Sequence, residues 1–97
     1  MFSEGVYKLC KQIPKGRIST YCEIAKALNT KAYRAVGNAL NKNPYKNVPC
    51  HRIVKATSEI GGFARGTENK IKLLKKEGIK IKSNKVVNFE KLLYHFK

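Results

Sequence analysis

Apolar residues near the start of the chain recur every three or four positions, a spacing that predicts a helix over residues 3–12. The positions that form its apolar face are Val6, Leu9, Cys10 and Ile13. Pro14 and Gly16 predict a turn directly after this helix, because both residue types interrupt helical structure. Residues 17–19 are then expected to be a short extended segment that leads into a second helix.

The second helix is predicted to begin at Thr20, which forms a capping box with Glu23 three residues later. Its apolar face comprises Ile24, Ala27 and Leu28. Asn29 and Thr30 predict a tight turn, with Thr30 as the N-cap of a third helix. The third helix has an apolar face of Ala32, Ala35, Val36, Ala39 and Leu40 and an opposite polar stripe of Lys31, Arg34, Asn38 and Asn41. Two short helices joined by a tight turn predict a helix-turn-helix.

A long loop is predicted after the third helix. Asn43-Pro44 is expected to end that helix, because proline cannot continue it. Residues 45–66 are expected to be mostly loop, with Ile53-Val54 as a short strand. Together with the elements that follow, this pattern predicts a mainly α fold, a winged-helix-like helix-turn-helix domain with small β elements.

The C-terminal third predicts a helix, a hairpin and a last helix. The helix is marked by Ile71, Leu73 and Leu74 and is closed by Lys75, Lys76 and Gly78. Residues 79–87 predict a small hairpin around Ser83-Asn84. Asn88 is expected to cap a last helix that continues through Phe96.

The composition predicts one small domain that binds nucleic acid. The chain has 97 residues, with 21 Lys and Arg against 6 acidic residues and a formal net charge of +15. We expect residues 1–97 to form a single domain, too small to enclose a large cavity. Such a cationic surface attracts phosphate backbones through counterion release. No membrane partner is expected, because the chain has neither a long apolar run nor a basic helix with a Trp/Phe-rich face.

Cysteine usage predicts a reduced chain in the cytoplasm. The three cysteines are Cys10, Cys22 and Cys50. Their number is odd, they include no Cys-x-x-Cys pair, and the N-terminus lacks the apolar stretch of a secretory signal. We therefore expect no disulfide framework, no structural metal site and no cofactor.

The tetrapeptide Pro49-Cys50-His51-Arg52 places a thiol beside an imidazole. A free thiol is mostly protonated at neutral pH, and a neighbouring histidine together with surrounding positive charge favours the thiolate. Cys50 is therefore a candidate nucleophile. The alternative is that Cys50 is a small buried hydrophobic residue and His51 an ordinary loop residue, which is the commoner situation for a Cys-His pair taken alone.

The octamer Asn47-Val48-Pro49-Cys50-His51-Arg52-Ile53-Val54 resembles the active-site signature of the O6-alkylguanine-DNA alkyltransferases. Other segments are similar to family blocks in the family's order, namely residues 14–16 with Thr20-Tyr21, residues 34–40, Asn43-Pro44, Gly61-Gly62-Phe63 and Lys76-Glu77-Gly78. The resemblance covers the family's C-terminal, catalytic and DNA-binding domain. It implies a single-domain version, without the N-terminal domain of many members and the metal site that some carry there.

This resemblance implies a DNA repair protein that takes the alkyl group from O6 of a flipped-out guanine. Cys50 is expected to keep the group as a thioether, so that one molecule repairs one lesion. His51 is expected to take the thiol proton through a water, and Glu77 to hold the imidazole in place. Tyr21 is expected to quench charge on the departing guanine. Without the resemblance, Glu77 would be read as a solvated acid at a helix end and Tyr21 as a core residue.

The resemblance also implies how DNA is bound. Arg34 is expected to fill the gap left by the flipped nucleotide, although by itself it would be read as an ordinary phosphate contact. Small residues keep the third helix thin enough for the minor groove, namely Ala32, Ala35, Gly37 and Ala39. The other expected contacts are Lys31, Asn38 and Arg52. The expected partner is double-stranded DNA containing O6-alkylguanine, bound by a monomer.

The substrate pocket is expected to comprise Asn43, Pro49, Phe63 and Ala64. Asn43 matches a family asparagine that ties the helix-turn-helix to the active-site loop, and Phe63 matches a pocket aromatic. The chain departs from the family at Ala64-Arg65, where members often have Ser-Gly or a similar small pair. This difference removes one potential hydrogen bond to the substrate and adds charge to the rim of the pocket. The resemblance therefore does not decide which alkyl groups the pocket accepts.

Two other classes of protein share some of these features. The alkyltransferase-like proteins bind alkylated DNA without repairing it and typically carry Trp in place of the reactive cysteine, so Cys50 argues against that class. A small helix-turn-helix regulator or chromatin protein would account for the charge and the helix pair. It would leave Cys50, His51, Arg52 and Glu77 unexplained.

Overall fold

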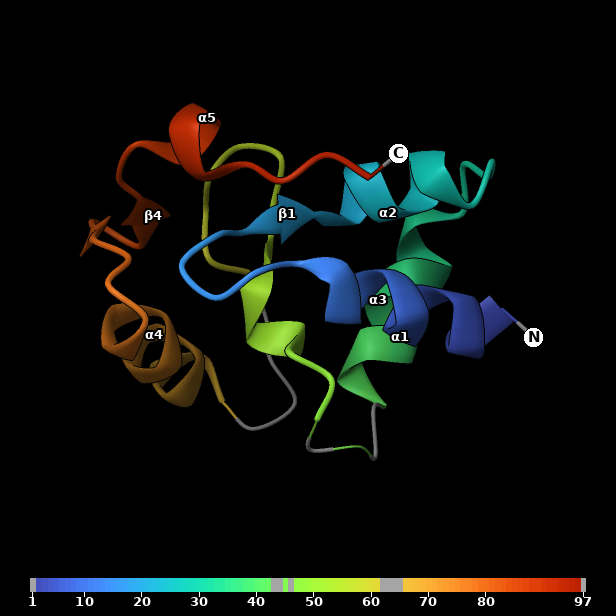
Figure 1. Ribbon diagram of the computed structural model, residues 1–97, viewed down its shortest axis with the longest axis horizontal. Coiled ribbons are helices and arrows are strands. Elements are labelled where there is room, and N and C mark those ends of the chain that lie inside the picture. Colours follow the sequence, from blue (N-terminus) through green and yellow to red (C-terminus); the bar gives the residue numbers. More distant parts are fainter. Residues whose placement is uncertain (1, 43–44, 46, 62–65, 97) are drawn as a thin grey trace.

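The computed structural model describes residues 2–42, 45, 47–61 and 66–96. Short helices joined by loops make up most of the structure, together with two small pairs of strands (Figure 1). In chain order the elements are α1 (Phe2–Gln12), β1 (Ser19–Thr20), α2 (Tyr21–Ala27), α3 (Tyr33–Asn41), η1, a 3-10 turn (Cys50–Arg52), β2 (Ile53–Val54), α4 (Thr67–Lys76), β3 (Ile81–Lys82), β4 (Lys85–Val86) and α5 (Phe89–Leu92). The predicted mainly α fold with small β elements is confirmed.

The first helix and the turn after it agree with the sequence pattern. Val6 and Cys10 of α1 are buried, and so is Ile13 just beyond the end of the helix. In the turn, the Arg17 N–H donates to the Pro14 carbonyl over 3.1 Å. Gly16 has a φ of 86°, a conformation that glycine adopts without steric cost. This turn leads the chain from α1 into β1.

The helix-turn-helix formed by α2 and α3 is also present. The Thr20 hydroxyl accepts a hydrogen bond of 3.1 Å from the Glu23 N–H, which is the predicted N-cap of α2. The prediction that Thr30 caps α3 is wrong, because the N-cap is Ala32. The Thr30 hydroxyl instead accepts from the Ala32 N–H over 3.1 Å, a local bond that closes the turn before the helix starts.

Burial along the two helices differs from the prediction at a few alanines. Ile24 of α2 and Val36, Ala39 and Leu40 of α3 are buried, as predicted. Ala27 and Ala32 are exposed, and Ala35 is half-buried. On α2, which packs against α1 and α3, Ala25 is buried and Ala27 is not. The stripe of Lys31, Arg34, Asn38 and Asn41 is exposed, as predicted.

The described residues form two strand pairs, one between distant segments and one within a hairpin. β1 pairs in parallel with β2, so that Ser19 lies opposite Ile53 and Thr20 opposite Val54. This pairing brings the segment that follows Cys50 to the start of α2. β3 and β4 form the predicted hairpin, whose turn residues Ser83 and Asn84 have φ angles of 51° and 65°. Both central residues of a tight type I′ hairpin turn need this left-handed conformation.

The C-terminal segment corrects the prediction of a helix through Phe96, because α5 ends at Leu92. Residues 93–96 run beside β1, where the Tyr94 N–H donates to the Ile18 carbonyl over 2.7 Å (Figure 1). Pairing with β1 satisfies backbone groups that a longer helix would have satisfied internally. Asn88 precedes α5 in the left-handed conformation, but its side chain makes no cap hydrogen bond.

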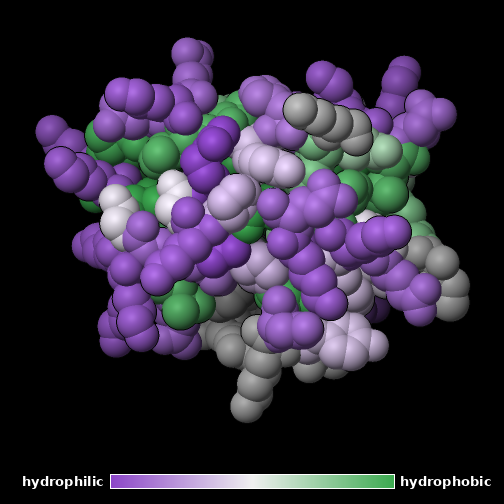
Figure 2. All heavy atoms as spheres, viewed as in Figure 1, coloured by the Kyte–Doolittle hydropathy of each residue, from purple (hydrophilic) through white to green (hydrophobic). Residues whose placement is uncertain are grey.

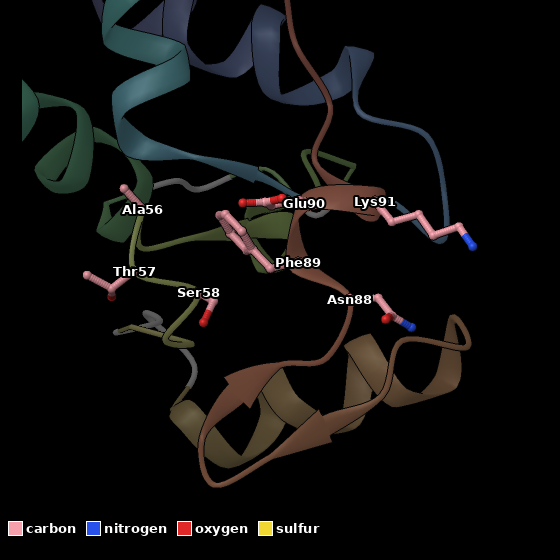
Figure 3. A pocket seen from close by; sticks show the side chains of 7 residues that line it. All are labelled: Ala56, Thr57, Ser58, Asn88, Phe89, Glu90 and Lys91. Atoms are coloured by element: carbon pink, nitrogen blue, oxygen red, sulfur yellow. The ribbon is translucent and has the colours of Figure 1, made fainter.

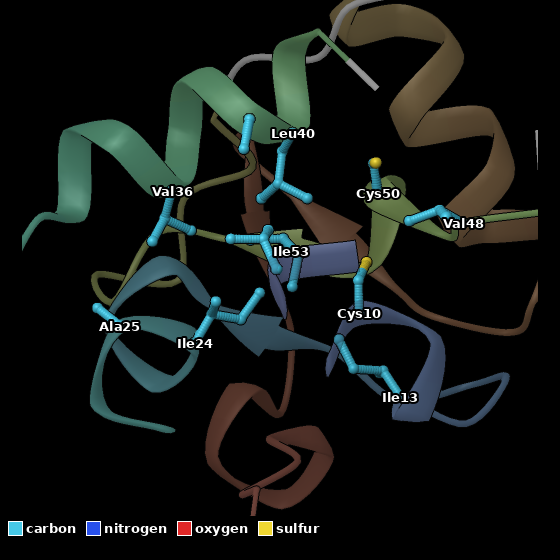
Figure 4. Packing of buried hydrophobic residues seen from close by; sticks show 11 residues of the cluster. Cys10, Ile13, Ile24, Ala25, Val36, Leu40, Val48, Cys50 and Ile53 are labelled. Carbon is cyan, nitrogen blue, oxygen red and sulfur yellow. The ribbon is translucent and has the colours of Figure 1, made fainter. Parts of the chain in front are cut away.

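The buried apolar residues form two clusters. The first lies between α1, the helix-turn-helix and η1, and it includes Cys10, Cys50 and Ile53 (Figure 4). The second lies beneath α4 and the β3–β4 hairpin and includes Leu74. Hydrophilic side chains cover most of the face shown in Figure 2. The strands β1 and β2 link the two clusters, since Ile53 belongs to the first and Val54 to the second.

Candidate active site

Cys50 begins the η1 turn and is buried, with 8% of its surface exposed. Its N–H donates to the Val48 carbonyl over 2.8 Å, and the Arg52 N–H donates to the Pro49 carbonyl over 3.0 Å. These bonds fold the backbone tightly around the cysteine, and β2 then holds the end of the turn against β1. The thiol is therefore held at a defined position in the core, near the edge of the first apolar cluster.

Glu77, at the C-terminal end of α4, joins the active-site turn to the helix. Its Oε2 lies 2.7 Å from the His51 Nε2 and 2.8 Å from the Arg52 Nη2. Its Oε1 accepts from the Arg52 Nε over 3.0 Å and from the Gly16 N–H over 3.4 Å. The Glu77 and His51 side chains are only 10% and 13% exposed. One carboxylate therefore binds His51, Arg52 and the turn after α1 at once.

These contacts determine the charge states of Glu77 and His51. Burial alone would raise the pKa of Glu77, but the hydrogen bonds from Arg52 and His51 outweigh it and lower the pKa to about 2. Burial lowers the pKa of His51, and contact with Glu77 opposes that shift without cancelling it. At neutral pH the pair is therefore a carboxylate beside a neutral imidazole. Because Nε2 faces the acid, it carries the ring proton, and Nδ1 is left as the acceptor.

Arg52, which is expected at the DNA interface, makes its hydrogen bonds within the protein. Its side chain is 16% exposed and binds Glu77, while its Nη1 donates to the Ile13 carbonyl over 2.8 Å. A two-point contact of this kind holds the carboxylate in one orientation. Arg52 thus links the active-site turn to Glu77 and to the segment that follows α1.

A groove of about 630 Å³ runs along the exposed side of α3. Its lining residues are Tyr21, Lys31, Ala32, Tyr33, Arg34, Gly37, Asn38, Asn41 and Lys55. Among them are four expected site residues from α3 or its N-terminal side, together with Tyr21 from the start of α2. Burial raises the pKa of Tyr21, so its hydroxyl keeps its proton as a hydrogen-bond donor.

The small residues of this surface allow a close approach to Tyr21. A Cβ at Gly37 would lie 4.0 Å from the Tyr21 ring, and one at Gly61 would lie 3.4 Å from the Tyr21 hydroxyl. Gly61 has a φ of 76°, so a larger residue there would be strained as well as crowded. Ala35, also expected at the DNA interface, is half-buried on α3. Pro49 is half-buried directly before Cys50.

Three expected pocket residues, Asn43, Phe63 and Ala64, lie outside the described residues. A separate cavity of about 560 Å³ lies between residues 56–58 and α5 (Figure 3). It is lined by Ala56, Thr57, Ser58, Asn88, Phe89, Glu90 and Lys91. None of these is an expected site residue. The groove along α3, by contrast, is lined by Tyr21 and by four expected site residues, Lys31, Arg34, Gly37 and Asn38.

Two residues near Cys50 were not assigned to the site from the sequence. Cys10 of α1 lies in the same apolar cluster as Cys50 (Figure 4), and the interaction of the two side chains and burial both raise the pKa of Cys10. Lys70 of α4 is 1% exposed. The signal that could have revealed Lys70 is its spacing, because it lies four positions before the apolar Leu74 and seven before Glu77.

Within residues 2–42, 45, 47–61 and 66–96, no three His, Cys, Asp or Glu side chains gather in a way that could hold a metal ion. Over the same ranges, every helix is too short or too polar to cross a bilayer.

The structure combines a helix-turn-helix, a groove along the exposed side of α3, and the buried Cys50 followed by the His51-Glu77 pair. Together these features define a class of protein, a helix-turn-helix domain that carries a candidate nucleophile. Residues 1–79 match the family described as 6-O-methylguanine DNA methyltransferase, DNA binding domain. The match covers most of the chain, including Cys50, His51 and Glu77. The chain belongs to this family.

Related sequences agree with that membership. A methylated-DNA–protein-cysteine methyltransferase from Sulfolobus acidocaldarius is 48% identical over 83 residues, which is 84% of this chain and 52% of the relative. The protein of the same name from Methanosarcina acetivorans is 48% identical over 79 residues, covering 79% of this chain and 51% of the relative. The chain thus spans about half the length of the curated relatives that it matches.

Solved structures share the fold. S. pombe Atl1, in complex with damaged DNA containing O6-carboxymethylguanine, has a TM-score of 0.83 and 29% identity over 96% of this chain and 94% of that one. Mycobacterium tuberculosis OGT in complex with DNA has a TM-score of 0.75 and 38% identity over 78% of this chain and 48% of that one. The O6-methylguanine-DNA methyltransferase of Pyrococcus kodakaraensis has a TM-score of 0.74 and 45% identity over 80% of this chain and 46% of that one.

Proposed function

We propose that this chain repairs DNA by moving the alkyl group of an O6-alkylguanine to Cys50, once per molecule. The observation that carries the proposal is the contact of 2.7 Å between His51 and Glu77, placed directly after the buried Cys50. This arrangement contains a nucleophile, a base and a group that orients the base. The names of the methyltransferase relatives support the same activity.

The reaction begins with the thiol proton. His51 Nδ1 accepts it through a water, and Glu77 stabilises the imidazolium that forms. The Cys50 sulfur then forms a bond to the alkyl carbon as the bond from that carbon to guanine O6 breaks. The electron pair of the broken bond stays on O6, and the Tyr21 hydroxyl donates a hydrogen bond to the departing guanine. Because a thioether is a poor leaving group, the alkyl group stays on Cys50.

Arg52 takes a part in this proposal that differs from the contact expected from the sequence. It holds Glu77 by two-point hydrogen bonds and connects the active-site turn to the segment just after α1 through the Ile13 carbonyl. We assign it to the orientation of Glu77. Its charge also assists in keeping Glu77 ionised.

The groove along α3 is the proposed binding surface for double-stranded DNA, with its minor groove facing Ala35, Gly37 and Asn38. Arg34 fills the space of the flipped nucleotide, and Lys31 binds a phosphate. The pocket for the flipped base is assigned to Asn43, Pro49, Phe63 and Ala64. The protein acts as a monomer in the cytoplasm, where reducing conditions keep its thiols free.

A second candidate function is binding to alkylated DNA without transfer. It is favoured by the likeness to S. pombe Atl1, which extends over 96% of this chain and 94% of that protein. Cys50 and its neighbours His51 and Glu77 favour transfer over binding alone, because a protein that only binds has no use for an oriented base beside a thiol.

Incubation with duplex DNA containing O6-methylguanine, followed by intact-protein and peptide mass measurement, tests the proposal. Stoichiometric transfer of one methyl group to Cys50 is expected, and Cys50→Ser should abolish it. Cys22→Ser is the matched control, because Cys22 lies on α2 outside the site, and it should react normally. Tight binding without any mass change would favour the second candidate, and methylation of Cys10 or Cys22 would contradict the assignment of Cys50.

A further inference from the structure

Two charged residues, Lys70 and Glu77, lie on one face of α4. Glu77 follows Lys70 by seven positions, about two helical turns, so both project from the same side of the helix about 10 Å apart along its axis. The buried Leu74 lies between them on that side. α4 packs against η1, and its Glu77 end contacts His51 and Arg52. The Lys70 end is therefore directed toward the other end of the same turn, where Cys50 lies.

The burial of Lys70 is unusual for its residue type. Only 1% of its surface is exposed, and it is one of the largest fully buried side chains of the described chain. The other lysines of α4, Lys72, Lys75 and Lys76, are exposed. Lysine is almost never fully buried unless other groups compensate its charge, because desolvation of an ammonium group is costly. Its position thus requires negative charge or strong dipoles nearby.

The charges around Lys70 come from α1 and η1. Burial lowers the pKa of Lys70 to about 8, and negative charge on Cys50 and on Cys10 opposes that shift. In return, the Lys70 charge opposes the rise in the Cys10 pKa that Cys50 and burial cause, and it adds to the lowering of the His51 pKa by burial. Both thiols therefore lie within electrostatic reach of the ammonium group, and Figure 4 shows them in one cluster close to α4.

We propose that Lys70 is a positioning residue for the alkyl transfer, whose buried ammonium stabilises the thiolate of Cys50 while Glu77, on the same face of α4, stabilises the imidazolium of His51. One helix thus presents a cation to the nucleophile and an anion to the base. The role in transfer rests on the proposed function, but the effect on the thiol does not.

The charges in this step balance without a proton from Lys70. The Cys50 thiol loses its proton to His51, which creates a thiolate and an imidazolium together. Lys70 stays protonated and faces the new negative charge, while Glu77 faces the new positive charge. When the sulfur then bonds to the alkyl carbon, the thiolate charge passes to the departing guanine. The stabilisation by Lys70 is thereby confined to the steps before bond formation.

The rate at which iodoacetamide modifies Cys50, measured against pH by peptide mass, tests the proposal. Replacing Lys70 with Met should move the midpoint of this profile up by about one pH unit, since an opposite charge at close range shifts a thiol by that order. The modification rate at neutral pH should fall about tenfold. Lys70→Arg should keep most of the rate, and Lys72→Met, which removes an exposed lysine of the same helix, should change nothing.

A profile of Lys70→Met that superimposes on that of the unaltered protein would overturn the proposal. A measurement on the unaltered chain covers the case in which this variant fails to fold. Lys70 is titrated by NMR before and after Cys50 is capped with iodoacetamide, which replaces a potential thiolate with a neutral thioether. The pKa of Lys70 should fall on capping, and an unchanged value would also overturn the proposal.

The two proposals can fail separately. Methyl transfer from DNA by the unaltered protein decides the proposed function alone. If the iodoacetamide profile moves as expected but no transfer occurs, the electrostatic role of Lys70 stands and the repair activity falls. If transfer occurs and the profile of Lys70→Met does not move, Lys70 is only a structural residue.

Discussion

His51 Nε2 and Glu77 Oε2 lie 2.7 Å apart although 26 positions separate the two residues along the chain. The contact directs the protonated ring nitrogen toward the acid and leaves Nδ1 as the proton acceptor. Arg52 binds the same carboxylate oxygen over 2.8 Å, so the acid is held from two sides. A substitution at Glu77 therefore acts on the orientation of His51 as well as on its charge.

Glu77→Gln should slow methyl transfer by about 100- to 10,000-fold, the range of a general-base contribution, because the imidazolium loses its counter-charge. DNA affinity should change little, since Glu77 points into the protein. Single-turnover rates and a binding titration on the same duplex measure both quantities. Glu68→Gln, an exposed acid in the first turn of α4, is the control and should react at the normal rate. A normal rate for Glu77→Gln would show that Glu77 has only a structural role.

The Glu77 pKa also predicts an acid-dependent loss of stability. Its pKa is lowered from 4.5 to about 2, so the ionised form stabilises the folded state; this contribution is fully present above pH 4.5 and is lost as the pH falls toward about 2. The expected loss is on the order of 3 kcal/mol. Urea unfolding at several pH values across this window should show a weaker pH dependence for Glu77→Gln. Equal dependence in both proteins would contradict the assigned shift.

Arg34→Ala should slow repair of duplex DNA while leaving reaction with free O6-benzylguanine nearly unchanged, because a free base requires no flipping. Flipping costs a few kcal/mol, and a planar guanidinium that occupies the gap offsets part of it. Arg34→Lys should recover the duplex rate only in part, since lysine restores the charge without the plane. Lys11→Ala, an equal loss of charge on α1, is the control. Equal losses with duplex and free base would assign Arg34 to the pocket or the fold.

DNA binding should weaken steeply with salt, because the chain carries a formal net charge of +15. Each phosphate contact that is removed should reduce the slope of a log-log salt plot by about 0.9. Lys31→Ala in the α3 groove should show that reduction, and Lys91→Ala on α5 should not, because Lys91 lies outside the groove. A nearly flat plot for the unaltered protein would contradict this mode of binding.

Arg17→Met should destabilise the fold by about 2 kcal/mol through loss of the attachment of the C-terminal segment. The guanidinium donates to the Leu92 carbonyl over 2.9 Å and to the Leu93 carbonyl over 2.8 Å, and both acceptors would be left without this donor. Urea unfolding measures the loss, with Lys15→Met in the neighbouring exposed turn as the control. A variant as stable as the unaltered protein would show that the strand contacts of Ile18 and Tyr94 suffice.

Local patterns predicted α1, the helix-turn-helix and the β3–β4 hairpin correctly because each depends on contacts close in sequence. The Thr20 cap, the Pro14–Gly16 turn and the Ser83-Asn84 turn are decided by side chains within a few residues of the bonds they make. Residues 93–96 are an exception. They have a helical pattern, but they pair with the backbone beside β1, and no residue nearby in the sequence indicates this pairing.

Three features follow from the sequence alone: the Pro49-Cys50-His51-Arg52 tetrapeptide, the net positive charge and the exposed stripe of α3. Each depends only on which residues are neighbours in the chain or recur at helical spacing. The contact of Arg52 with Glu77 and the burial of Lys70 depend on the tertiary structure. The reason is physical: a side chain's charge is set by its residue type, whereas its solvation and its partners depend on segments that meet only when α1, η1 and α4 pack together.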